Sequence, residues 1–472
     1  MSAADERMSR VDTAWLRMDN DVNLMMIVGI WLLEPGVAYD ALCERIASKL
    51  LKYDRFRQKV VQDAMGASWV DDTEFDIHRH VRREVLRRKR GESERSALQR
   101  HAGELATTAL DSAHPLWQFD LIEEYEGGSA MILRIHHCIG DGIALVSVVL
   151  TLTDGGSDPP KRRRGAAHAG EADWLTDSVL KPLTELSVKA IDLAGGGVAK
   201  SMEVLSNPKL RGAELVRVGA QVLSDVAALA LMSDDSPTRL KGKPIGQKVI
   251  AWGEPIPLDA VKAIGKALGA SVNDVLLACV AGAIGHYLRD QGDTTDGQEI
   301  RAMVPVNLRP LDKAWQLGNQ FGLAPLVLPI GIVHPVERVY AVRARMNELK
   351  NSYQPLLAFA VLAIAGLTIK PVQDAILGLF SKKATAVMTN VPGPAAPLKL
   401  CGSAMRQTMF WVPASGDIGV GVSVLSYAGG VQFGLITDKG LCPKPQQIID
   451  RFEPEFEKLM MVTLMLPWGD AA

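Results

Sequence analysis

The segment His136-His137-Cys138-Ile139-Gly140-Asp141-Gly142 has the pattern H-H-x-x-x-D-G and decides how the rest of the chain is interpreted. An apolar run at 131–135, typical of a strand, comes directly before it. A second apolar run at 143–150 follows and predicts a buried helix or strand. We therefore expect two imidazoles at the end of a core element, next to a tight Gly-Asp-Gly turn.

The two histidines of this segment are predicted to point in opposite directions. Side chains alternate across a strand, so His137 shares a face with Leu133 and Ile135, whereas His136 shares the other face with Arg134. Only one imidazole can then face a given cavity. His137 lies nearer the turn and is the candidate general base, since histidine commonly takes this role near neutral pH.

Asp141 and Gly142 complete the candidate catalytic segment. We expect Asp141 to hold the turn by pairing with an arginine or with backbone N–H groups, and Gly142, which has no Cβ, to admit a ligand or another backbone. No metal site is predicted, because adjacent histidines on opposite faces are poor joint ligands and the chain has no H-E-x-x-H or paired C-x-x-C. Cys138 is interpreted as a small core residue rather than a nucleophile.

Further segments, in a fixed order along the chain, extend the pattern. They are 8–19 (MSRVDTAWLRMD), Pro115-Leu116-Trp117, 271–278 (SVNDVLLA), 304–309 (VPVNLR), 318–322 (GNQFG), 390–394 (NVPGP) and 433–438 (FGLITD). H-H-x-x-x-D-G alone is typical of acyltransferases that use coenzyme A or carrier-protein thioesters. With the ordered set, the chain resembles the bacterial wax ester synthase/diacylglycerol acyltransferase family over nearly its whole length.

The resemblance implies both a fold and an activity. The fold is α/β (α+β), with two pseudo-symmetric chloramphenicol-acetyltransferase-like domains, mixed sheets flanked by helices and an active-site tunnel between them. The activity is transfer of a long-chain acyl group from acyl-CoA, a co-substrate, to diacylglycerol or a long-chain alcohol, with no other cofactor. The alternatives are a carrier-protein-dependent condensation enzyme and a non-catalytic lipid-binding relative.

This sequence departs from the family at three places. Leu24-Met25-Met26 stands where Pro-Met-His is common, the basic stretch 86–91 replaces a Leu-Pro-rich loop, and Gln118 replaces a glutamate. None of these departures involves the proposed base, so they leave the reaction class intact. They leave the acceptor and the contact with a membrane open.

Asn273 and Asp274 have two interpretations. Ser271 with Asp274 before an apolar run resembles a capping box at a helix start, where an acid also suits the helix dipole. The family resemblance instead implies that the Asn-Asp pair belongs to the surroundings of the active site. Asn273 is then a candidate to donate a hydrogen bond to the substrate carbonyl or to orient the acceptor, and Asp274 is a substrate-binding candidate beside it.

The composition is that of an ordinary globular protein of 472 residues, 47% hydrophobic and 22% charged. A formal net charge of −2 argues against a nucleic-acid partner. The five scattered cysteines imply no disulfide framework and fit a reducing compartment. This length predicts more than one domain, and we expect acyltransferase halves at 1–153 and 245–472, joined by a breaker-rich linker and helical crossover at 154–244.

The N-terminus lacks an apolar signal region, and no run reaches the ~18–20 apolar residues of a spanning helix. The expected location is therefore the cytoplasm, with or without attachment at the inner face of the membrane or at lipid inclusions. The basic run from Arg79 to Arg90 is interpreted as a solvated face, an anionic-lipid contact or a docking surface for coenzyme A phosphates.

Overall fold

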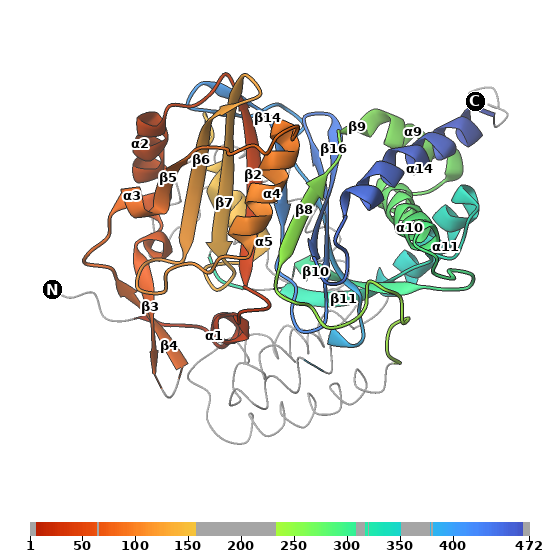
Figure 1. The fold of residues 1–472 in the computed structure, drawn as a ribbon, viewed down its shortest axis with the longest axis horizontal. Helices are drawn as coiled ribbons and strands as arrows, with labels where there is room; N and C mark the ends of the chain where they lie inside the picture. The colour runs from red at the N-terminus through yellow and green to blue at the C-terminus, as the bar shows by residue number, and fades with distance from the viewer. Residues whose placement is uncertain are drawn as a thin grey trace, which may run out of the picture.

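The computed structural model describes residues 6–63, 66–156, 233–307, 317–319, 321–350, 378 and 381–465. Two large mixed β-sheets lie side by side in this part of the chain, with helices packed around them (Figure 1). This arrangement confirms the expected α/β class with mixed sheets flanked by helices. Most of the predicted crossover at 154–244, the end of the segment 304–309 and residue 320 of the segment 318–322 lie outside the described residues.

The first sheet has six strands in the order β13-β14-β2-β7-β6-β5. All its pairs are antiparallel except β5 with β6. Its strands are β2 (Met26–Glu34), β5 (Val81–Glu84), β6 (Trp117–Tyr125), β7 (Gly128–His136), β13 (Lys399–Leu400) and β14 (Ser403–Trp411). The helices of this part are α1 (Arg10–Met18), α2 (Tyr39–Lys49), α3 (Ile77–His80), α4 (Glu94–Ala106) and α5 (Gly142–Leu150), with short 3₁₀ turns at Leu50–Lys52 and Asp54–Phe56.

A small antiparallel sheet in the order β1-β4-β3 lies beside α1 (Figure 1). It consists of β1 (Glu6–Arg7), β3 (Gln58–Asp63) and β4 (Gly66–Asp71). The Met8 N–H donates to the Ala67 carbonyl at 2.9 Å, which fixes the start of α1 against β4.

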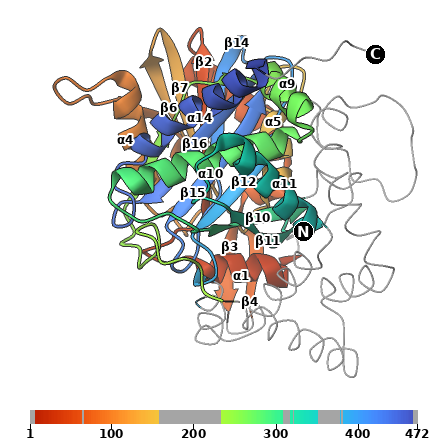
Figure 2. The same ribbon diagram turned by 90° about the vertical axis from the view of Figure 1, so that its right-hand side faces the viewer.

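The second sheet follows the order β11-β10-β12-β15-β16-β8, and β9 also pairs with β16. Its strands are β8 (Lys248–Trp252), β9 (Ile256–Pro257), β10 (Ile300–Asn307), β11 (Phe321–Leu328), β12 (Ala386–Pro392), β15 (Val420–Tyr427) and β16 (Gly430–Asp438). One face is covered by α9 (Leu258–Leu268), α10 (Val272–Asp290), α11 (Pro335–Lys350) and α14 (Gln446–Met465), as Figure 2 shows. The apolar side chains of α10 are almost all buried, which explains why its sequence is apolar on every side.

The C-terminal part of the chain contributes β13 and β14 to the first sheet. β14 comes from the C-terminal part of the sequence but pairs with β2 in the first sheet, with Trp411 opposite Val28 (Figure 1). A buried cluster that contains Leu98 of α4, Trp252 of β8 and Trp411 joins the two sheets. The predicted boundaries at 153 and 245 remain a prediction, and the topology adds that the segment 399–411 belongs structurally to the N-terminal sheet.

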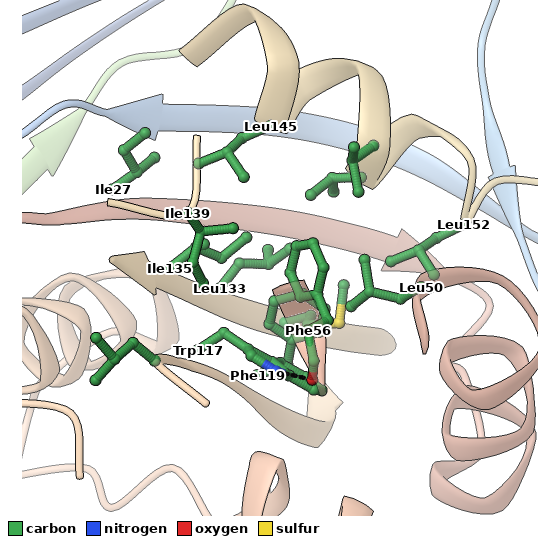
Figure 3. Close-up of a cluster of buried hydrophobic side chains, with 14 of the residues drawn as sticks. Ile27, Leu50, Phe56, Trp117, Phe119, Leu133, Ile135, Ile139, Leu145 and Leu152 are labelled. Carbon is green, nitrogen blue, oxygen red and sulfur yellow. Dashed lines mark hydrogen bonds between the residues drawn. The ribbon is translucent and has the colours of Figure 1, made fainter. Parts of the chain in front are cut away.

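The core of the N-terminal half fixes the strand that precedes the histidine pair. Trp117 is almost fully buried, and its indole N–H donates to the Phe56 carbonyl at 2.9 Å (Figure 3). The Leu116 carbonyl accepts a hydrogen bond from the His136 N–H at 2.9 Å. Pro115-Leu116-Trp117 is therefore an architectural element next to the motif, and replacing a buried tryptophan of this kind by alanine typically costs ~3–5 kcal/mol.

Two expected elements are confirmed with shifted ends. The strand-like run at 131–135 lies in β7, and the apolar run at 143–150 is the helix α5. All five cysteines are free thiols. Among the described helices, none is by itself both long and apolar enough to cross a membrane, and α9 with α10 meets that criterion only as a pair bent by 100°.

Candidate active site

His137 directly follows the end of β7, where the chain leaves the first sheet. Its side chain is 3% exposed, and its ring stacks on Trp15 of α1 with centroids 4.1 Å apart and planes inclined by 16°. The His137 N–H donates to the Met25 carbonyl at 2.7 Å. The ring is thus held among residues that come from separate parts of the sequence.

Burial is the main influence on the protonation of His137, and it lowers the pKa of the imidazole to about 4. The charge of Asp141 and a hydrogen bond to the backbone of His137 itself oppose this shift, but they are smaller. The imidazole is therefore neutral at physiological pH, which is the protonation state that a general base requires.

His136, the last residue of β7, is engaged by neighbouring groups. Its Nδ1 accepts the Cys138 N–H at 3.1 Å, and its Nε2 lies 3.7 Å from the Asp19 carboxylate. His137 lies just beyond the end of β7, and the opposite facing of the two histidines stays a prediction. Cys138 is fully buried, and burial raises the pKa of its thiol well above the usual value, so that it stays protonated.

Asp141 begins α5 as its N-cap residue. The carboxylate is buried and accepts the Ala144 N–H at 2.9 Å. Of the two partners expected from the sequence, an arginine or backbone N–H groups, the described hydrogen bond is to the backbone. Asp141 also lies close enough to His137 to influence its pKa.

An apolar cavity lies between the two sheets next to this loop. It encloses about 750 Å³ of empty space, part of which is open to solvent. Leu133 and Ile135 of β7 line it together with Gly142, and no heavy atom lies within 4 Å of where a Cβ on Gly142 would be. The other walls come from β2, α5, β14 and β15, from Val391 of β12, and from Gly393, Pro394 and Leu398 after β12. Leu133 and Ile135, which were predicted to share a strand face with His137, thus line the cavity, whereas His137 itself is not among the lining residues.

Asn273 and Asp274 lie at the other helix start that the sequence singled out. The Ser271 hydroxyl accepts the Asp274 N–H at 3.1 Å, and the Asp274 carboxylate accepts the Ser271 N–H at 2.8 Å, which is a complete capping box. The second carboxylate oxygen of Asp274 is buried and has no hydrogen-bond partner among the described residues. Asn273 accepts a hydrogen bond from Asn390 at 3.1 Å, one residue before the cavity-lining Val391.

Sequence reasoning assigned no role to three residues that surround His137. They are Trp15 and Asp12 of α1 and Asn319, whose amide Nδ2 donates to the His137 carbonyl at 2.8 Å. Their segments, 8–19 and 318–322, were part of the ordered set, but a sequence does not show that they meet at the histidine. Within the described part of the chain, no group of three or more His, Cys, Asp or Glu side chains is arranged to hold a metal ion.

Comparison with known proteins gives a consistent family. The wax ester synthase/diacylglycerol acyltransferase catalytic domain matches residues 8–276, and the C-terminal domain of the same family matches residues 317–460. The probable diacylglycerol O-acyltransferase tgs1 of Mycobacterium tuberculosis is 26% identical over 469 residues, which cover 97% of this chain and 96% of that protein. A probable diacylglycerol O-acyltransferase, tgs2, of the same species is 25% identical and covers 95% and 97%.

Solved structures show the same fold. The wax ester synthase/diacylglycerol acyltransferase of Marinobacter aquaeolei superposes with a TM-score of 0.67 at 19% identity, covering 98% of this chain and all of that one. The first condensation domain of the calcium-dependent antibiotic synthetase superposes with a TM-score of 0.57 at 13% identity, covering 98% of this chain and 97% of that one. On the family matches, which span most of its length, this chain belongs to the wax ester synthase/diacylglycerol acyltransferase family.

Proposed function

We propose that this protein is an O-acyltransferase that moves a long-chain fatty acyl group from acyl-CoA to diacylglycerol or a long-chain alcohol, forming triacylglycerol or a wax ester. The observation that carries the proposal is His137, a neutral buried imidazole in the loop between two cavity-lining residues, Ile135 and Gly142. Membership of the family and the names of the mycobacterial relatives support the same reaction.

His137 acts as the general base. It accepts the hydroxyl proton of the acceptor as that oxygen attacks the thioester carbon, and it returns the proton to the coenzyme A thiolate when the C–S bond breaks. A thioester is already activated, so no covalent enzyme intermediate is needed. Proton transfer of this kind typically contributes ~10²–10⁴ in rate.

The other candidate residues support this step. Backbone N–H groups at the loop stabilise the oxyanion, and Asn273 is the side-chain candidate for the same task, since its partner Asn390 adjoins the cavity. Gly142 leaves room for the substrate, whereas Asp141 and His136 position the loop. The apolar cavity holds part of the acyl chain, with Gly142 next to the reacting carbon.

The test is coenzyme A release by the purified protein from a long-chain acyl-CoA, with hexadecanol and diacylglycerol offered separately and His137→Ala as the control. Release that needs both an acceptor and His137 is the expected result, and the faster acceptor identifies the substrate. No release with either acceptor would contradict the proposal and favour a carrier-dependent or non-catalytic protein.

We further propose a cytoplasmic protein that contacts anionic lipid through the stretch from Arg82 to Arg90. Val85 at its centre is 82% exposed, and Arg87, Lys89 and Arg90 are exposed around it, whereas Arg88 pairs with Glu94. Each basic residue near an anionic membrane surface contributes ~1 kcal/mol to the free energy of membrane binding. Co-sedimentation with phosphatidylserine vesicles, but not with phosphatidylcholine vesicles, is expected. Arg87→Glu/Arg90→Glu should abolish it, and unchanged binding of that variant would exclude this surface.

A further inference from the structure

A short segment of the C-terminal half lies directly on the catalytic loop. Gly318 forms a parallel bridge with Gly140, and the Asp141 N–H donates to the Gly318 carbonyl at 3.2 Å. The φ angle of Gly318 is +115°, a region that glycine adopts far more easily than other residues. The loop that carries the candidate base is therefore completed by backbone from the other half.

Asn319 extends this contact to His137 itself. It is 5% exposed, and its amide Nδ2 donates both to the His137 carbonyl at 2.8 Å and to the Asp12 carboxylate at 2.7 Å. Its backbone N–H donates to the same oxygen of Asp12 at 3.0 Å. Both partners of the amide group are acceptors, so its nitrogen, and not its oxygen, must face them.

Asp12 anchors this amide from the first helix. The carboxylate is 6% exposed, and burial raises its pKa, although the hydrogen bonds from Asn319 and Ser9 act in the opposite direction. Trp15, three residues further along α1, stacks on the His137 ring. The helix α1 thus contacts the His137 ring directly through Trp15. It contacts the backbone carbonyl of His137 indirectly, through Asp12 and Asn319.

We propose that Asn319 and Asp12 are positioning residues for the candidate base, linking α1, the 317–319 segment and the His137 carbonyl in one buried relay. The proposal rests on the proposed function of His137. The His137 N–H is bonded to the Met25 carbonyl and the His137 carbonyl to the Asn319 amide, so the backbone that carries the ring is held in place. Since these hydrogen bonds join the two halves, the base is in place only when the halves are packed together.

The first test is Asn319→Ala, with Asn23→Ala as a matched control. Asn23 is also buried and also donates from the N-terminal part to a carbonyl of the C-terminal part, Gly416 at 2.9 Å, but no described hydrogen bond joins its side chain to His137. Misplacement of a catalytic group by about 1 Å can cost ~10² in rate. We expect kcat of Asn319→Ala to fall ~10–100-fold, while the KM for acyl-CoA stays within about threefold. An equal loss in Asn23→Ala would overturn the proposal.

A swapped pair separates positioning from simple stabilisation. In Asp12→Asn/Asn319→Asp the two side chains can still hydrogen-bond to each other, but a carboxylate at 319 has no hydrogen to donate to the His137 carbonyl. The swapped protein is therefore expected to fold and to remain as slow as Asn319→Ala. Wild-type turnover in the swap would show that only the link between the halves matters and would overturn the proposal.

A third measurement does not depend on turnover. Diethylpyrocarbonate modifies accessible imidazoles, and peptide mass spectrometry reports the rate at His137. We expect modification at least about tenfold faster in Asn319→Ala than in wild type and Asn23→Ala, because the loop opens locally. Equal rates would overturn the positioning role, even if the wild-type protein transferred no acyl group and the proposed function had failed.

Discussion

Two helix starts in this molecule use the same local device in different surroundings. Asp141 caps α5 by accepting a backbone N–H, and Ser271 with Asp274 caps α10 in the same manner. At α5, contacts from distant parts of the chain converge on the neighbouring His137. At α10, the cap is complete within four residues, and the described long-range side-chain hydrogen bond of this turn is that of Asn273 to Asn390. An acid at a helix start is thus explained by capping, and only the convergence of distant groups on a base distinguishes a catalytic loop.

The largest effect is expected at the loop that precedes α5. His137→Ala should lower kcat by at least ~10², because it removes the only proposed proton acceptor. Its melting temperature should stay close to that of the wild-type protein, because neighbouring side chains can move into the space that the ring leaves. Steady-state kinetics with thermal unfolding checks both. Near-normal turnover in a folded variant would remove the distinction between the two helix starts.

The protonation of His137 should make the free energy of unfolding fall at acidic pH. The pKa of His137 is about 4 in the folded protein and near 6.5 in the unfolded chain. Well above pH 6.5 the imidazole is neutral in both states, so it adds no pH dependence to the free energy of unfolding. Below that pH the unfolded state binds the proton first, so stability is lost as pH falls from 6.5 toward 4. Between pH 7 and pH 5 the loss from this residue is about 2 kcal/mol.

Denaturant unfolding of wild type and His137→Gln at both pH values measures this contribution. From pH 7 to pH 5 the wild-type protein should lose about 2 kcal/mol more unfolding free energy than His137→Gln, because the glutamine does not titrate. The difference removes the background of other buried histidines, such as His80, whose pKa is also lowered by burial. An identical pH response in both proteins would mean that His137 is hydrated rather than buried.

Asp141→Ala should act mainly through stability. Loss of an N-cap typically costs ~0.5–2 kcal/mol, and the buried Ala144 N–H would be left without its acceptor. Activity should fall with the population of the folded loop. Thermal unfolding combined with turnover below the transition is the measurement. An unchanged melting temperature with lost activity would give Asp141 a direct role in the chemistry.

The sequence was informative where the pattern is local. The apolar run before His136 predicted β7, and the apolar run after Gly142 predicted a buried element, which is the helix α5. It was less informative where contacts are distant. Asn319 reaches a carbonyl 182 residues earlier and a carboxylate 307 residues earlier, and β14 pairs with β2 across nearly the whole chain. Such pairings depend on how the sheets assemble, which no local pattern encodes.

The smallest effect is expected at the α10 start. Asp274→Ala should cost about 1 kcal/mol of stability through loss of the capping box and leave kcat within about threefold. The Ser271→Ala variant and the double variant complete a cycle in which the two losses are not additive, because each side chain caps the other's N–H. One observation opposes this expectation: the second carboxylate oxygen of Asp274 is buried without a hydrogen-bond partner among the described residues. If Asp274→Ala loses turnover at unchanged stability, that oxygen receives a substrate group, and both helix starts belong to the active site.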